Sequence, residues 1–171
     1  MNKTIDEMIK RRSIRSYKPD PVDEAVLEKI LEAGTYAATG GGRQSPVMVV
    51  VTDKALRDKL SRMNAAVMGK DTDPFYGAPA VVVVLADPNR NTYVEDGSLV
   101  IGNLMLAASA LGVGSCWIHR AREMFASDEG KELLREWGIP DYVGIGNCIL
   151  GYVEGDIPEA APRKENYIIR T

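Results

Sequence analysis

Histidine and cysteine are scarce in this chain, which limits the chemistry that its side chains alone could perform. His119 is the only histidine in 171 residues, and the two cysteines, Cys116 and Cys148, lack CxxC spacing. A serine triad would need His119 and a GxSxG turn, which the sequence does not contain. A zinc site would have only these three ligands, and on a strand Cys116 and His119 would face opposite sides. The sequence therefore disfavours a hydrolytic triad, a metal centre and a disulfide framework.

Glycine loops for phosphates and long apolar leaders are also missing. GVGSCW begins with GxG but lacks a third glycine, GIGNCILG misses the GxGxxG spacing of a dinucleotide turn, and there is no Walker A motif. The first residues, MNKTIDEMIKRR, contain no long apolar run, so we predict no signal or transit peptide. Residues 97–118 carry no charge, but Gly112 and Gly114 interrupt them, which predicts a buried helix, a turn and a strand rather than a membrane span. We expect a cytoplasmic protein with a single domain over residues 1–171.

Positive charge is concentrated at the start of the chain. Residues 1–18 hold six Lys or Arg against two Asp or Glu, although the net charge of the whole chain is −3. Duplex DNA needs a broad basic face, so no nucleic-acid partner is expected. The segment KRRSIRSY has two interpretations: its cations complement the negative end of a preceding helix, or they surround a small phosphate. The residues alone leave both open.

Apolar periodicity predicts alternating helices and strands. Five helices are expected: one that Thr4 caps and that ends near the arginines, one that ends at Gly34, and three over residues 53–68, 93–111 and 127–137. Strands are expected at residues 47–52 and 80–86, each buried on both faces, and at residues 115–118 and 144–152. Near-continuous apolar strands alternating with helices indicate a layered α/β or α+β protein.

Several motifs in a fixed order resemble the FMN-dependent nitroreductase family, above all its small single-domain bacterial members. They are RRSIRSY, a proline-containing break, a helix ending in AGTYAATGGGRQSPVMVVV, and GIGNCILGY followed by PRK. The resemblance implies an α+β fold: an α/β/α sandwich with a central mixed sheet, in an intertwined homodimer with FMN in its interface. A dimer would explain why residues 93–111 are apolar all round, although a helix buried within one subunit would look the same. The tail, residues 153–171, would extend over the partner.

The resemblance also implies which residues bind the cofactor. The cluster after the first helix would hold the flavin phosphate and ribityl chain, a loop glutamine would contact the flavin, backbone after the central helix would approach the ring, and a basic pair in the tail would return to the phosphate. These residues are Arg11, Arg12, Ser13, Arg15, Gln44, Trp117, Ile118, His119, Arg120, Arg163 and Lys164. Two positions depart from the family pattern, since Gly42 stands where asparagine is frequent and Ala161 where a second basic residue is usual.

The implied activity is that of an oxidoreductase in which FMN supplies the redox chemistry. Electrons would pass from NAD(P)H to an organic acceptor, such as a nitroaromatic or a quinone, in a ping-pong cycle. His119 and Tyr76 are candidates for protonating the acceptor, and water could serve instead. Two alternatives remain, namely a non-catalytic carrier or sensor of FMN or another phosphate ligand, and a flavin-dependent dehalogenase on the same fold.

Overall fold

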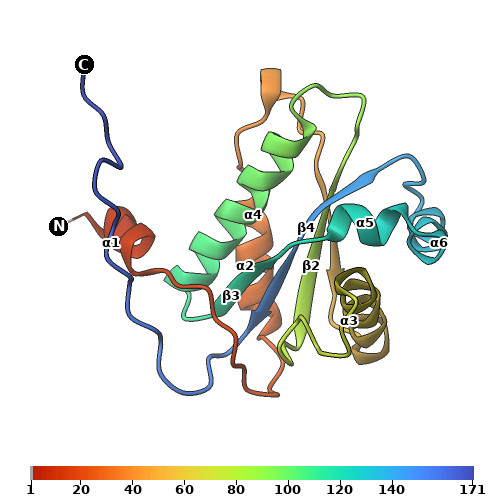
Figure 1. Cartoon of the computed structure of the whole chain (residues 1–171), viewed down its shortest axis with the longest axis horizontal. Helices are drawn as coiled ribbons and strands as arrows, with labels where there is room; N and C mark the ends of the chain where they lie inside the picture. The colour runs from red at the N-terminus through yellow and green to blue at the C-terminus, as the bar shows by residue number, and fades with distance from the viewer. Residues whose placement is uncertain (1) are drawn as a thin grey trace.

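A four-stranded sheet with helices on both faces forms the body of the protein (Figure 1). The computed structural model describes residues 2–171. The strands lie in the order β1-β2-β4-β3 and comprise β1 (Val47–Val51), β2 (Ala80–Ala86), β3 (Gly114–Ile118) and β4 (Val143–Gly151). The predicted α+β sandwich is confirmed.

The direction of the strands differs from the expected mixed sheet. All three pairings between the four strands are antiparallel, and the one parallel bridge among residues 2–171 joins Ser13 to Ser115. The helix after β1 is followed by the connection 69–79, which brings the chain back to the end of the sheet where β1 finished, so that Val51 pairs with Val81. Because of this return, β2 runs opposite to β1.

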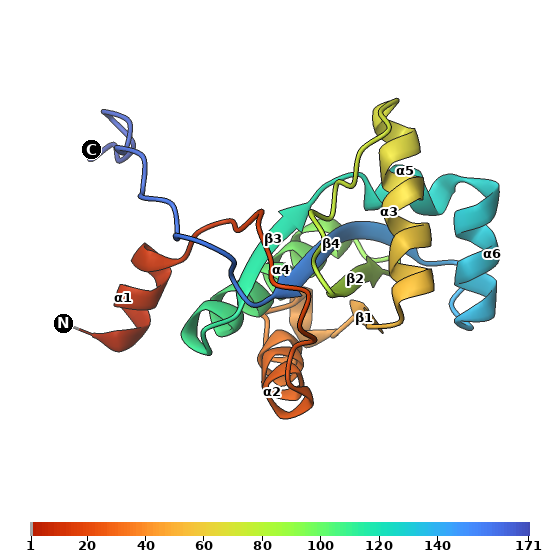
Figure 2. The ribbon, with the colours of Figure 1, turned by 90° about the horizontal axis from the view of Figure 1, so that it is seen from below.

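Two helical layers enclose the sheet. The helices are α1 (Lys3–Lys10), α2 (Glu24–Thr35), α3 (Lys54–Met68), α4 (Tyr93–Ala110), α5 (Ala121–Ala126) and α6 (Asp128–Glu136). Helices α2 and α4 cover one face, and α3, α5 and α6 cover the other (Figures 1 and 2). Each face carries its own cluster of buried apolar side chains.

The two strands that were expected to be buried on both faces differ. Every residue of β2 is buried, as predicted. In β1 only Val51 is buried, because β1 is an edge strand that pairs with β2 alone. The prediction of a doubly buried β1 was therefore wrong: β-branched composition does not distinguish a central strand from an edge strand.

Helix ends correct two further predictions. The cap of α1 is Asn2, whose side chain accepts a hydrogen bond from the Thr4 backbone N–H at 3.0 Å, so Thr4 is not the cap. Helix α2 continues through Gly34 to Thr35. Gly34 is a packing position, because a Cβ there would lie 2.9 Å from Cδ2 of Leu104 on α4.

The region after β3 contains one helix that the sequence did not predict. Helix α5 has only six residues, which is too short to give a clear periodic signal. The next prediction is confirmed, since Ser127 caps α6 by accepting a hydrogen bond from the Gly130 N–H at 3.1 Å. The two helices thus meet at Ser127.

Helix α4 packs one side on the sheet and leaves the other side partly open. Ile101 and Leu104 are fully buried, whereas Val94, Leu99 and Leu111 are 44%, 49% and 40% exposed. One chain therefore does not enclose this apolar helix. Among residues 2–171, no helix combines the length and the apolar character needed to cross a bilayer. The predicted sequence of helix, turn and strand over residues 97–118 is confirmed.

The two ends of the chain project from the body on the same side (Figures 1 and 2). None of the residues of α1 is buried. Residues 154–171 form no helix or strand, and all of them are exposed. The placement of this tail over a partner subunit stays a prediction.

Candidate functional site

A cavity of about 400 Å³ lies beside the C-terminal end of β3. Three distant parts of the chain form its walls: the segment after α1, the end of α3 with the connection that follows it, and the residues from Cys116 to Arg120. The fold thus brings five of the predicted cofactor-binding residues to one place, and these are Arg15, Trp117, Ile118, His119 and Arg120.

Both candidates for protonating an acceptor, His119 and Tyr76, line this same cavity. The Tyr76 side chain is 43% exposed, and the Arg15 guanidinium lies 6.0 Å from the centre of its ring. At this distance a cation and an aromatic face attract each other. The cavity therefore has a cationic and aromatic rim at Arg15 and Tyr76.

The segment after α1 runs alongside β3. Ser13 pairs with Ser115, and the Ile14 N–H donates to the Ser115 carbonyl at 2.9 Å. The buried Tyr17 hydroxyl donates to the Ile14 carbonyl at 2.7 Å, and burial raises the pKa of Tyr17 far above its ordinary value, so it stays protonated. These contacts hold the arginine cluster against β3. Cys116, which follows Ser115 in this strand, lines the cavity.

Arg12 in the arginine cluster bonds the C-terminal end of α1, and two N–H donors of the cluster have no acceptor among residues 2–171. Nη1 of Arg12 donates to the carbonyls of Ile9 and Arg11 at 2.7 and 2.8 Å, and so complements the C-terminal end of α1. Nη1 of Arg11 and Nε of Arg12 are buried and have no acceptor among residues 2–171. A buried charged donor without an acceptor is costly, and a phosphate would supply the acceptor. The cluster therefore fits a phosphate-bearing ligand.

Gln44 does not reach this cavity within one chain. It is exposed and lines a separate cavity of about 160 Å³ with Thr39 and Met48. The loop around it turns tightly, with a φ of 66° at Gly42 and 50° at Gln44. Asparagine tolerates this left-handed region better than most residues, so the departure at Gly42 keeps the same backbone possible.

The predicted basic pair of the tail also lies away from the cavity in one chain. The Arg163 guanidinium donates to the Ala161 carbonyl at 2.6 and 3.2 Å, and Nζ of Lys164 lies 5.1 Å from the centre of the Tyr167 ring. Both residues are exposed. Their role at a phosphate stays a prediction.

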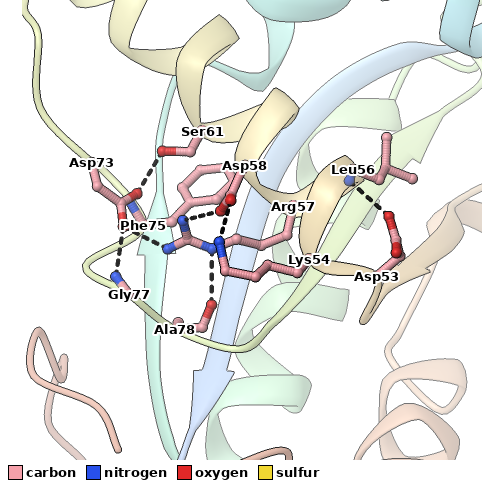
Figure 3. A network of polar contacts seen from close by, with 10 residues as sticks. All are labelled: Asp53, Lys54, Leu56, Arg57, Asp58, Ser61, Asp73, Phe75, Gly77 and Ala78. Carbon is pink, nitrogen blue, oxygen red and sulfur yellow. Dashed lines mark hydrogen bonds and ion pairs between the residues drawn. The ribbon is translucent and has the colours of Figure 1, made fainter. Parts of the chain in front are cut away.

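A polar network that was not predicted from the sequence holds one wall of the cavity (Figure 3). Nη2 of Arg57 on α3 donates to Asp73 at 2.6 Å, and Ser61 on α3 also donates to Asp73. Asp73 accepts two further bonds from the backbone N–H groups of Phe75 and Gly77, at 2.9 and 2.7 Å. The network therefore ties the connection that carries Tyr76 to α3.

The charge on Asp73 is favoured by these donors. Burial alone would raise the pKa of Asp73, but the hydrogen bonds from Arg57, Ser61 and the backbone outweigh it and hold the pKa below its usual range. A carboxylate with a lowered pKa stabilises the fold above the unfolded pKa, and this contribution is lost as the pH falls through the folded pKa.

Replacing Asp73 by Asn should lower the free energy of unfolding at pH 7 by about 1–2 kcal/mol, because the buried Arg57 loses the nearer of its two carboxylate partners, keeping Asp58 at 3.1 Å, and water partly screens the pair. The Asp73 side chain is 38% exposed, which keeps the effect at this modest level. The difference between the two proteins should shrink as the pH falls below about 4, the ordinary pKa of the carboxyl in the unfolded chain, toward the lower pKa that Asp73 has in the folded protein. Urea unfolding from pH 7 to pH 3 measures both effects. Asp71→Asn, at an exposed neighbour, is the matched control, and an equal loss there would contradict the role of Asp73.

A weak signal for the missed residues was present in the sequence. Arg57, Ser61 and Asn64 lie at i, i+4 and i+7 of the predicted helix 53–68, which places them on one face. They are only 7%, 5% and 0% exposed. A polar stripe at helical spacing can equally be a solvated face, and only the packing of residues 69–79 and 119–120 on α3 distinguishes the two.

The fold and the cavity together define an α+β sandwich protein with a cavity whose rim carries the Arg15 guanidinium and the Tyr76 ring. The chain matches the family described as "Nitroreductase family" over residues 8–73 and 68–152. This match covers well over half of the sequence. The chain belongs to the nitroreductase family.

Relatives and solved structures agree with this assignment. A protein of Archaeoglobus fulgidus, provisionally named NADH dehydrogenase/NAD(P)H nitroreductase, is 34% identical over 95% of this chain and 94% of its own length. The NADPH-flavin oxidoreductase of Vibrio harveyi is 28% identical over 99% of this chain and 73% of its own. A nitroreductase from Bacteroides fragilis with bound FMN superposes with a TM-score of 0.92 at 26% identity, over the full length of both chains.

Proposed function

We propose that this protein is an FMN-dependent oxidoreductase that passes electrons from NAD(P)H to a small organic acceptor, such as a nitroaromatic or a quinone. The observation that carries the proposal is the cavity where Arg15, Tyr76 and residues 117–120 meet, together with the unused buried donors of Arg11 and Arg12 on the segment that pairs with β3. Relatives named as NADPH-flavin oxidoreductase and FMN reductase support the same reaction class. Buried free thiols at Cys116 and Cys148 fit action in the reducing cytoplasm.

The candidate residues divide into two binding roles. Arg11, Arg12, Ser13 and Arg15 would hold the phosphate and ribityl chain, with guanidinium groups as charge-assisted donors. The backbone from Trp117 to Arg120 would lie along the isoalloxazine ring and donate to it. Bound FMN would supply the redox chemistry, which is the transfer of two electrons from NAD(P)H to the acceptor.

Two side chains that line the 400 Å³ cavity are candidates for protonating the acceptor. His119 and Tyr76 are both exposed and both line the cavity, so either could donate a proton to an acceptor bound there. Because both side chains are exposed to solvent, water could donate this proton instead. Loss of turnover with retained flavin in His119→Ala or Tyr76→Phe would identify the donor.

Anaerobic reduction tests the proposed activity directly. Protein loaded with FMN should lose its flavin absorbance when NADH or NADPH is added, and regain it when a quinone or a nitroaromatic is added. If FMN binds but neither nicotinamide reduces it, the carrier or sensor alternative holds instead. Colourless protein that refuses added FMN would contradict any flavin function.

We further propose that the protein acts as a homodimer in which α1, the outer side of α4 and the tail pack against a partner. Helix α1 has eight residues and no buried side chain, although Ile5, Met8 and Ile9 give it an apolar side that is 53%, 57% and 64% exposed. Such a short helix is marginal without packing. In a dimer, residues 1–171 would form one domain whose tail, 153–171, extends over the other subunit and returns Arg163 and Lys164 to a phosphate.

Replacing Ile9 by Asp should convert the dimer into a monomer, because a charge would enter the apolar contact of α1. Sedimentation velocity measures the oligomeric state. Val67→Asp is the matched control, since Val67 is 39% exposed on α3, which covers the opposite face of the sheet. Dissociation by both variants, or by neither, would contradict the assignment of this surface.

A further inference from the structure

The turn after β3 has an unusual backbone conformation. Arg120 has a φ of 76°, in the left-handed region that L-residues other than glycine, asparagine and aspartate seldom occupy. The preceding residue, His119, and Arg120 itself both line the 400 Å³ cavity. A strained residue persists only where its surroundings hold it, and such positions cluster at functional sites.

One buried amide holds this turn from the neighbouring helix. Asn64 on α3 is fully buried. Its Nδ2 donates to the His119 carbonyl at 2.7 Å, and its Oδ1 accepts from Nε of Arg120 at 3.0 Å. Nδ2 also lies 3.1 Å from Sδ of Met124 on α5. The single side chain thus contacts both residues of the turn and the helix that follows.

We propose that Asn64 is a positioning residue for the flavin cavity, which holds His119 and Arg120 in the conformation that shapes the wall facing the ring. The naming of the ligand rests on the proposed function, whereas the contacts of the turn do not. With Ser61 and Arg57, Asn64 completes a buried polar stripe on α3 that holds the two walls of the cavity, at residues 70–76 and at residues 119–120.

A purely structural role for Asn64 makes a different prediction. If Asn64 only satisfied buried polar groups, Nε of Arg120 among them, its loss would cost the same with alanine or glycine at position 120, because neither residue has that donor. If it holds a left-handed backbone at position 120, its loss should matter much less with glycine there than with alanine, because glycine adopts that conformation without steric cost. The two roles are separated by the coupling between positions 64 and 120.

The test is a double-mutant cycle that compares Asn64→Ala in two backgrounds, Arg120→Ala and Arg120→Gly, with the FMN dissociation constant measured by quenching of flavin fluorescence. Asn64→Ala should weaken binding about tenfold in the Arg120→Ala background, which corresponds to the cost of a left-handed L-residue. In the Arg120→Gly background the same change should weaken binding by about twofold at most, because glycine needs no help. An equal effect in both backgrounds, or none in either, overturns the proposal.

Two further measurements keep the result interpretable. Leu60→Ala removes a fully buried apolar side chain from the same helix, and should lower the melting temperature while leaving the FMN dissociation constant unchanged. Amide hydrogen exchange at residues 119–121 of FMN-free protein should speed up on Asn64→Ala in the Arg120→Ala background and not in the Arg120→Gly background. If wild type binds no FMN, the proposed function fails and the flavin role of Asn64 with it, while the exchange result still confirms or refutes the hold on the turn.

Discussion

Replacing Arg11 by Glu should abolish FMN binding, with a dissociation constant weakened by at least about a hundredfold. Nη1 of Arg11 is a buried donor without an acceptor among residues 2–171, so it is the donor of the cluster that a phosphate would satisfy best. The change removes charge-assisted hydrogen bonds and places a carboxylate beside the phosphate, where like charges repel. Flavin absorbance after gel filtration, followed by a titration with FMN, measures the loss.

The matched control is Arg62→Glu, at an exposed position of α3. It changes the net charge of the protein equally and should keep stoichiometric FMN. Arg12→Glu should both release FMN and lower stability, because Arg12 also bonds the end of α1. Arg163→Glu should release FMN if the tail returns to the phosphate in the dimer. Retention of flavin by Arg11→Glu would show that the phosphate site lies elsewhere.

Replacing Gly144 by Ala should lower the free energy of unfolding by about 3 kcal/mol, a large loss for one methyl group. A Cβ at Gly144 would overlap the backbone carbonyl of Ala121, where α5 begins against β4. A backbone atom cannot move aside as the end of a flexible side chain can. Urea unfolding followed by circular dichroism measures the change.

Two companion variants test the steric reason. Ala121→Gly should not rescue Gly144→Ala, because the overlapping carbonyl belongs to the backbone. Gly146→Ala should cost less, about 1 kcal/mol, since the atoms nearest its Cβ belong to the Trp117 and Ile101 side chains, which can shift. Rescue by Ala121→Gly, or equal losses at both glycines, would contradict the argument.

Local sequence patterns are sufficient to locate most of the long helices and the buried strands. Apolar runs located β2 and β4, and helical spacing located α3, α4 and α6. These signals act within a few residues, so they are present in the chain before it folds. The cap at Ser127 is of the same kind, because the capping residue bonds a backbone N–H three residues away.

The site was predictable only where the family motifs mark it. Those motifs led to Arg15 and to residues 117–120, which meet at one cavity. They did not indicate Asn64 or Asp73, which act on backbone and side chains rather than on a ligand. The family resemblance also implied that Gln44 and Arg163 bind the same cofactor as Arg15. Within a single chain these residues lie apart.

Local sequence was enough to specify the strands and all the long helices but not α5, and it also showed the excess of positive charge around Arg11 and the scarcity of residues for side-chain catalysis. The folded chain was needed to establish that β1 is an edge strand, that the sheet is antiparallel, and that a polar stripe on α3 faces inward. The difference comes from distance along the chain. Propensity and capping depend on near neighbours, whereas burial, strand pairing and the bond between Asn64 and His119 depend on segments that meet only in the folded protein.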